Sequence, residues 1–315
     1  MPPRGDLTTF PQIEDLNRRE FMAGAFGTAL LIACGSDDDD DQTATSDPNG
    51  GFPRTVKHSL GETRIPTRPE RIVALADAEP LDCLLAVGLK PVLYGYSNAY
   101  GTGVPPWVTS IGGIGDIQSF DRPRGVELDL ERVVGVRPDL IIDVWTEPET
   151  YSRLSAIAPT IVIKADDAIL WQDVQRLAGV ATGRETEAEQ AIAATEAVIK
   201  AEAERVKSFA GRSVTIAYQF FDEFYMHGAQ APIGRVITDL GLSINAPDQS
   251  GLSILSLEQV RMAEDADILL SPEFIVGDAA KLEANPLFRN LAAVREGHYV
   301  PLPPEIARAG YLESA

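Results

Sequence analysis

The stretch from Glu185 to Ser208 constrains the fold of this chain more than any other segment. It contains no Gly or Pro, is rich in Ala, Glu and Lys, and places apolar residues such as Ile192, Val198 and Ile199 at helical spacing. A helix of this length is longer than the crossover helices that usually join neighbouring strands. We therefore expect it to connect two separately folded regions.

Short apolar segments alternate with helical segments on both sides of this stretch. Strands are expected at 71–75, 91–94, 140–142, 160–163, 214–217, 268–270 and 299–301, and helices at 79–87, 128–136, 151–157, 234–240 and 256–262. Such alternation is typical of parallel sheets that are covered by helices on both faces. The predicted fold class is α/β, with two Rossmann-like lobes of mostly parallel sheets joined by one long helix. The expected bounds are 54–183 for the first lobe, 184–208 for the helix and 209–315 for the second lobe.

The first 34 residues have the composition of an export signal. Arg18 and Arg19 precede an apolar run, residues 21–33, which is too short to span the roughly 30 Å core of a bilayer. Adjacent arginines followed closely by Phe21 resemble a twin-arginine export signal. We expect the mature chain to lie outside the cell membrane, in the periplasm or cell-wall space.

Cys34 directly follows the apolar run, and Leu31-Ile-Ala-Cys34 resembles a bacterial lipobox. A lipidated cysteine at this position would anchor the chain to the outer face of the membrane through its acyl chains alone. The alternative is an unmodified, buried cysteine. Residues 35–53 are polar and include an unbroken acidic run at 37–41, so they are expected to form a flexible acidic tether.

The charge and the histidine and cysteine content exclude several functions. The formal net charge of -20 argues against a nucleic-acid partner, because phosphate binding needs clustered Lys and Arg. The three histidines, His58, His227 and His298, are far apart and form no metal-ligand spacing with Cys34 or Cys83. We therefore expect no site for a bare transition metal.

An enzyme is the main alternative class. Gly112-Gly-Ile-Gly115 lacks the third glycine of a dinucleotide-binding loop, and the sequence has neither a Gly-x-Ser-x-Gly elbow nor a paired catalytic His and Cys. The sequence therefore predicts a binding protein without catalytic activity.

Several phrases of the chain, in the same order, resemble the siderophore- and cobalamin-type substrate-binding proteins of ABC importers. They are Arg68-Pro-Glu-Arg-Ile-Val-Ala-Leu75, Leu84-Leu-Ala-Val-Gly-Leu-Lys-Pro91, the segment 129–142, Leu154-Ser-Ala-Ile-Ala-Pro-Thr160, Asn285-Pro-Leu-Phe288 and the segment 292–300. The resemblance implies the helical-backbone (class III) architecture, in which a rigid helix bridges two lobes and the cleft is largely pre-formed. Members usually continue past their final strand into another helix, so the last helix of this chain is expected to be incomplete.

Ligands of open α/β sheets bind beyond the carboxyl ends of the strands. The segments after the expected strands carry the candidate ligand-binding residues Tyr96, Arg122, Arg124, Trp145, Phe221 and Tyr225. The resemblance places the anion-binding arginine at Arg124 or Arg122 and an aromatic wall at Trp145. The alternatives are that the arginines are solvent charges beside Asp121 and Glu127, and that Trp145 is a core aromatic.

The expected ligand is iron held as an intact siderophore chelate, because guanidinium groups bind its oxygens and aromatic rings cover its organic arms. No cofactor is expected. Haem and cobalamin are the alternatives, and His227 is the candidate axial ligand for haem. The resemblance also implies docking on a permease through Asp82 and Asp239, for which the alternative is ordinary surface acids. The protein is expected to act as a monomer.

Overall fold

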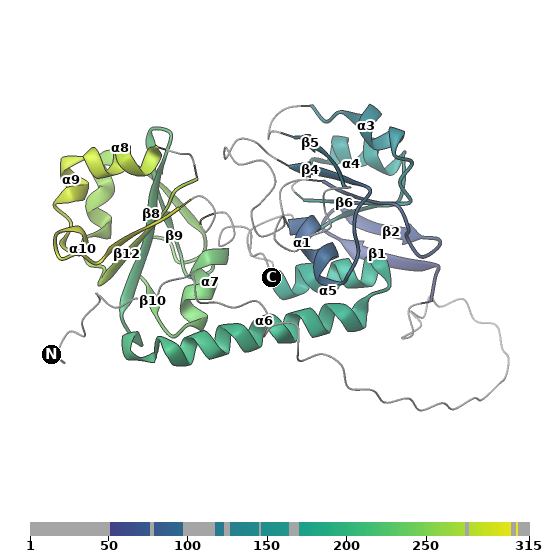
Figure 1. Ribbon diagram of the computed structural model, residues 1–315. Helices are drawn as coiled ribbons and strands as arrows, with labels where there is room; N and C mark the ends of the chain where they lie inside the picture. Colours follow the sequence, from purple (N-terminus) through teal and green to yellow (C-terminus); the bar gives the residue numbers. More distant parts are fainter. Residues whose placement is uncertain are drawn as a thin grey trace. The chain divides into compact units, whose positions relative to one another are not determined.

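The computed structural model describes residues 51–75, 79–96, 117–122, 127–144, 146–163, 170–274, 277–303 and 307. Residues 46–315 form one compact unit, distinct from residues 1–45. The described part contains two main sheets with separate cores and the long helix α6 (Figure 1). The expected export signal, Cys34, most of the tether and the expected incomplete last helix lie outside the described residues.

The first main sheet is five-stranded and entirely parallel. Its order is β5 (Gln118–Asp121), β4 (Leu93–Tyr96), β3 (Ile72–Ala74), β6 (Leu140–Asp143) and β7 (Thr160–Val162). The strands β3, β6 and β7 are buried along their whole length. Continuous apolar runs suit such strands because both faces of the sheet are covered.

Helices cover both faces of this sheet, as the alternation along β3 requires. Ile72 and Ala74 belong to a core with residues of α1 (Glu79–Ala86) and α5 (Trp171–Thr182). Val73 belongs to the opposite core, with Val133 of α3 (Leu130–Gly135) and Leu154 of α4 (Pro148–Ser155). Successive side chains of a strand point to opposite faces, so one short apolar strand supports both layers.

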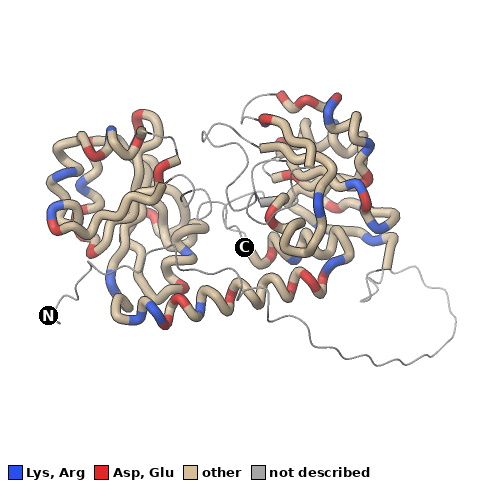
Figure 2. Tube along the Cα trace, viewed as in Figure 1, with Lys and Arg blue, Asp and Glu red and all other residues tan. Residues whose placement is uncertain are grey.

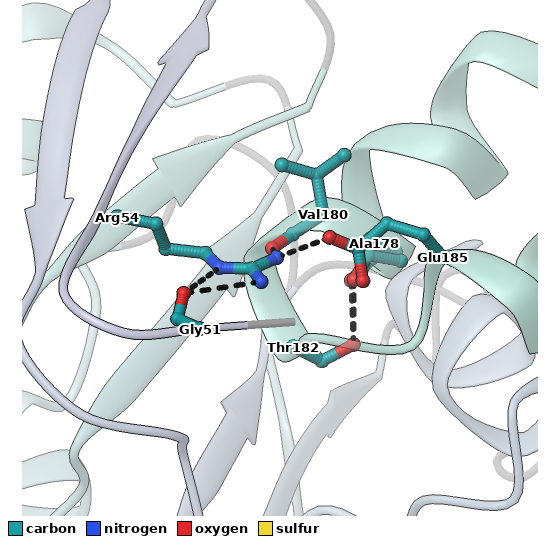
Figure 3. Close-up of polar contacts among 7 residues, drawn as sticks. Gly51, Arg54, Ala178, Val180, Thr182 and Glu185 are labelled. Atoms are coloured by element: carbon teal, nitrogen blue, oxygen red, sulfur yellow. Dashed lines mark hydrogen bonds and ion pairs between the residues drawn. The ribbon is translucent and has the colours of Figure 1, made fainter. Parts of the chain in front are cut away.

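A β-hairpin that the sequence reading missed precedes this sheet. It consists of β1 (Arg54–His58) and β2 (Gly61–Ile65). Arg54 fixes it to the helices, because its guanidinium donates to the Val180 carbonyl of α5 and lies 2.6 Å from the carboxylate of Glu185 (Figure 3). The Arg54 side chain is only 6% exposed. The hairpin is thereby held where α5 ends and α6 begins.

The helix α6 spans Glu185–Arg205, which confirms the helix expected between 185 and 208. It packs against α1 and α5, which precede it in the sequence, and against α7 (Pro232–Asp239), which follows it. A Cβ added at Gly179 of α5 would lie 2.6 Å from the Cβ of Ala188, so a glycine is needed where α5 and α6 meet. Charged residues of both signs lie along the rest of α6 (Figure 2).

The second main sheet is six-stranded and mixed. Its order is β11 (Leu252–Ser256), β9 (Glu223–His227), β8 (Ser213–Phe220), β12 (Ile268–Pro272) and β13 (Tyr299–Leu302), with β10 (Ser243–Ile244) also paired to β8. The strands β8, β10, β12 and β13 pair in parallel, whereas β9 runs antiparallel to β8 and β11. The sequence predicted β8, β12 and β13 but not β9, β10 or β11.

The second core lies between this sheet and short helical segments. These are η4 (Leu257–Ala263), α8 (Asp278–Ala284), α9 (Pro286–Arg289) and α10 (Ala292–Arg295), and their buried side chains contact Ala217, Phe224 and Leu269. Residues 256–262 were expected to form an α-helix, but the structure has the 3₁₀-helix η4 there. On α7, Ile233 packs with Val214 and Ile216 of β8.

Candidate functional site

Three strands of the first sheet end at polar residues. Tyr96 ends β4, Asp121 ends β5 and Asp143 ends β6. Because the strands are parallel, these residues share one edge of the sheet. The next residue after β5, Arg122, donates its backbone N–H to the Tyr96 carbonyl at 2.6 Å. Two of the predicted ligand-binding residues, Tyr96 and Arg122, are thus brought together.

Arg122 forms a forked ion pair with Asp143 across this edge. Its Nη1 lies 2.5 Å from Oδ1 of Asp143 and its Nη2 lies 3.0 Å from Oδ2. The strands β4 and β3 lie between β5 and β6 in the sheet, so the pair spans their ends. The Asp143 side chain is fully buried and that of Arg122 is 14% exposed. Only the planar guanidinium fork matches a carboxylate in this two-point manner.

The remaining hydrogen-bonding capacity of Asp143 is also used. The backbone N–H of Val144 donates to Oδ1 at 2.7 Å, and the hydroxyl of the buried Thr146 donates to Oδ2. Each carboxylate oxygen therefore accepts two hydrogen bonds. The sequence reading missed both Asp143 and Thr146. The signal was present, since an aspartate directly follows the apolar run Leu140-Ile-Ile.

These contacts change the interpretation of Arg122. It follows β5, a strand that the sequence did not predict. The alternative that it is a solvent charge beside Glu127 is wrong, because Asp143 is its partner and Glu127 pairs with Arg153 at 2.8 Å. A role for Arg122 in ligand binding stays a prediction. Arg124 and Trp145, the other two predicted residues of this edge, lie outside the described residues.

The second sheet presents aromatic side chains at the corresponding edge. The hairpin between β8 and β9 turns at Phe221 and Asp222. Phe221 is 66% exposed and has a φ of 54°, a left-handed conformation that is uncommon for a bulky residue. The amide of Gln219 donates to the Phe221 carbonyl at 2.7 Å and thereby supports this turn.

A cluster of rings lies beneath this tip. The Tyr218 ring stacks on the Tyr225 ring with centroids 5.3 Å apart and meets Phe274 edge-on at 4.8 Å. Phe220 contacts both Phe221, at 4.7 Å, and Tyr225, at 6.0 Å. Phe221 and Tyr225, which the sequence reading placed in a loop, therefore belong to one hairpin. The Tyr225 hydroxyl donates to the Glu223 carboxylate at 2.7 Å, and this bond raises the pKa of Tyr225.

His227 does not suit the alternative role of a haem ligand. It lies on β9 with 2% of its surface exposed, and its ring stacks against Tyr218 with centroids 5.5 Å apart. Burial lowers the pKa of His227 from 6.5 to about 4. An axial ligand must be reachable by a large planar cofactor, so this burial disfavours haem.

The two predicted docking residues differ in exposure. Asp239 ends α7 and is exposed, as docking requires. Asp82 lies in α1 and is only 6% exposed, so the alternative that it is an ordinary surface acid is wrong. It sits on the helix that packs against β3, beside the buried Leu81 and Leu84. Docking through either residue stays a prediction, and burial disfavours it for Asp82.

In the part of the chain that the structure describes, neither a cluster of metal ligands nor a membrane-spanning helix is found. No group of three or more His, Cys, Asp or Glu side chains in this part of the chain is arranged to hold a metal ion. No helix in the same part is both long and apolar enough to cross a membrane.

Comparison with known proteins assigns the class. A family model described as periplasmic binding protein matches residues 73–306. That match covers most of the chain, and the protein therefore belongs to the periplasmic binding protein family. This result and the relatives below confirm the resemblance found in the sequence.

Among curated relatives, the iron(3+)-hydroxamate-binding protein FhuD of Bacillus subtilis is 27% identical, over 90% of each chain. The Fe(3+)-citrate-binding protein YfmC of the same organism is 25% identical, over 87% of each chain. Among solved structures, Streptococcus pneumoniae PiaA in complex with ferrichrome has a TM-score of 0.65 and 24% identity, with 82% of this chain and 91% of that chain covered. These relatives confirm the predicted two-lobe α/β fold.

Proposed function

We propose that this protein captures an intact ferric siderophore outside the cell membrane and delivers it to the permease of an ABC importer. Family membership supports the general role of substrate binding, and several relatives are named for ferric chelates. In this proposal the protein binds its ligand without transforming it and needs no cofactor. The first sheet edge supplies hydrogen-bond donors and the second supplies aromatic rings.

The observation that carries the proposal is this pairing of polar and aromatic strand ends. A ferric siderophore has an oxygen shell around the metal and an organic periphery. Arg122 and Tyr96 offer N–H and O–H donors for the oxygens, and the rings of Phe221 and Tyr225 offer apolar surface for the periphery. The metal needs no protein ligand in such a complex, so a site without clustered metal ligands is sufficient.

Native mass spectrometry of the purified full chain tests the proposal. Ferrichrome, the Fe³⁺ complex of Desferal, Fe³⁺-citrate and Fe³⁺-enterobactin are each added, together with the iron-free siderophores as controls. We expect one ferric chelate per chain and quenching of tryptophan fluorescence at micromolar concentrations or below. If none of the four complexes changes the mass or the fluorescence, the proposed function is wrong.

Export and lipid anchoring form a separate part of the proposal. Arg18 and Arg19 would direct export, and Cys34 would carry the lipid. A Cys34→Ala variant should be released from the membrane fraction, whereas a Cys83→Ser variant should stay in it. A Cys34→Ala protein that still sediments with membranes would contradict the anchor.

Docking on the permease, with the protein as a monomer, completes the proposal. Asp239 is exposed at the end of α7 and is the better candidate of the two carboxylates. An Asp239→Asn variant should bind the chelate with unchanged affinity but support slower uptake, because surface charges mainly affect the association of protein partners. Equal uptake by the variant and the natural protein would show that Asp239 is not part of the docking surface.

A further inference from the structure

We propose that the ligand is an uncharged or cationic ferric chelate, of the trihydroxamate kind, and that the Arg122–Asp143 pair disfavours polyanionic chelates. This inference rests on the proposed function and names the substrate class within it. Arg122, one of the two arginines expected to attract an anion, has its charge compensated inside the protein. The consequence for the ligand follows from the charges at the two strand-end edges.

At the first edge, the charge of Arg122 is already matched. Asp143 is fully buried, and both of its oxygens accept from Arg122 as well as from Val144 or Thr146. An anionic ligand would meet a guanidinium whose charge this carboxylate already balances, so it gains little net electrostatic attraction unless it displaces Asp143. Pulling Arg122 away would leave Asp143 buried without its counter-charge, which is strongly unfavourable.

Arg122 nevertheless keeps donors for an uncharged ligand. A guanidinium has five N–H groups, and two of them donate to Asp143. The others can donate to neutral but polarised oxygens, such as those of a hydroxamate bound to iron, without breaking the ion pair. Arg122 thus acts as a hydrogen-bonding group whose net charge is cancelled.

The second edge has the same property. Lys281 of α8 lies 2.7 Å from the carboxylate of Asp278, whose side chain is 2% exposed. The hydrogen bond to Asp278, together with the nearby charge of Asp222 at the hairpin tip, raises the pKa of Lys281. Asp222 and Glu223 are themselves exposed acids beside Phe221. The described residues of this edge therefore repel a polyanion and tolerate a neutral or positive ligand.

The test compares the affinities of the full chain for four complexes by titration. Ferrichrome is uncharged and the Fe³⁺ complex of Desferal is a cation, whereas Fe³⁺-enterobactin and Fe³⁺-citrate are anionic. We expect the first two to bind at least about tenfold more tightly than the anionic pair, because one charge-assisted contact corresponds to about that factor. Tighter binding of an anionic complex overturns the inference and leaves the proposed function standing. Failure of all four overturns both.

Two variants test the role of the ion pair itself. Asp143→Asn keeps the shape of the side chain but frees the charge of Arg122, and should shift the ratio of affinities by about tenfold towards the anionic complexes. Asp139→Asn is the matched control, since it changes the net charge equally at the opposite end of β6, where Asp139 accepts from the backbone of Glu70 and Arg71. It should leave the ratio unchanged.

The double variant Arg122→Met with Asp143→Asn guards against a folding defect in the first variant, because neither charge is left buried without its partner. It removes the charge together with the donors, so it should weaken binding of ferrichrome without improving binding of Fe³⁺-enterobactin. Thermal unfolding of each variant is followed in parallel to establish that the chain is folded during the titrations. If Asp143→Asn is folded and its affinity ratio equals that of the natural protein, the pair does not set the selectivity and the inference fails.

Discussion

The two strand-end edges of this protein occupy equivalent places on their sheets but differ in chemistry. The edge of the first sheet is held by a buried ion pair, and Asp143 has no exposed surface. The edge of the second sheet carries a hairpin of aromatic residues whose tip, Phe221, is 66% exposed. The α/β architecture therefore determines where a ligand can bind, whereas the residues that end the strands determine which ligand chemistry each edge can bind.

The edges also differ in what their residues contribute to stability. Removing one partner of a buried charge pair leaves the other without compensation, so the first edge is tied to the fold. The exposed ring of Phe221 stands on a left-handed backbone position, which costs stability. We therefore expect loss of the ion pair at the first edge to lower the free energy of unfolding, and relief of the backbone strain at Phe221 to raise it.

The largest expected effect is at the first edge. Asp143→Ala should lower the free energy of unfolding by about 3–5 kcal/mol, because Arg122 loses its partner within a largely buried site. Urea denaturation measures this loss. Adding Arg122→Met to the same chain should recover much of the lost stability, because the unpaired charge is removed.

At the second edge, Glu223→Ala removes only an exposed hydrogen bond from Tyr225 and should lower the free energy of unfolding by about 1 kcal/mol or less. Equal losses of stability for Asp143→Ala and Glu223→Ala would show that the two edges do not differ in their contribution to the fold.

The next effect concerns pH and the second lobe. Burial lowers the pKa of His227 to about 4 in the folded protein, below the value of 6.5 expected when the chain is unfolded. Between these values the unfolded chain binds a proton that the folded chain does not, so acid stabilises the unfolded state. The contribution should reach about 3 kcal/mol of lost stability as the pH falls from 7 to 4.

Urea denaturation at several pH values, for the natural protein and for His227→Phe, isolates this contribution. The difference in stability between the two should change by about 3 kcal/mol over the window and stay constant above pH 7. His298→Gln serves as the control and should follow the natural protein. A difference that is independent of pH would show that His227 takes up its proton equally in both states.

The smallest expected effect is at Phe221. Phe221→Gly should raise the free energy of unfolding by up to about 1 kcal/mol, since glycine adopts a φ of 54° without strain. The same change should weaken binding of the preferred ferric chelate by about three- to tenfold through loss of one aromatic contact. Titration and urea denaturation are compared with those of Ile254→Ala, an exposed residue of β11, which should not change the affinity. If Phe221→Gly binds the ferric chelate with unchanged affinity, Phe221 is not part of the binding site.

The sequence predicted the strands that are buried on both faces, because their apolar runs carry the signal alone. It missed β1, β2, β5, β9, β10 and β11, which mix polar and apolar residues and are defined by their pairing partners. It identified Tyr96, Phe221 and Tyr225 as candidates because they follow expected strands, and Arg122 because it lies in a segment between two of them. It did not identify Asp143, because the importance of that residue depends on an arginine from a different strand.

Local periodicity and the order of short phrases are therefore enough to predict the α/β class, the long helix and the family. The charge of the candidate site depends instead on tertiary contacts. Arg122 follows β5 and Asp143 ends β6, two strands that β4 and β3 separate, and no local pattern indicates that the two residues meet. The same holds for Asp82, which helix packing buries although its position in the sequence suggests a surface acid. Burial and pairing arise between distant segments, and both set the electrostatics of a site.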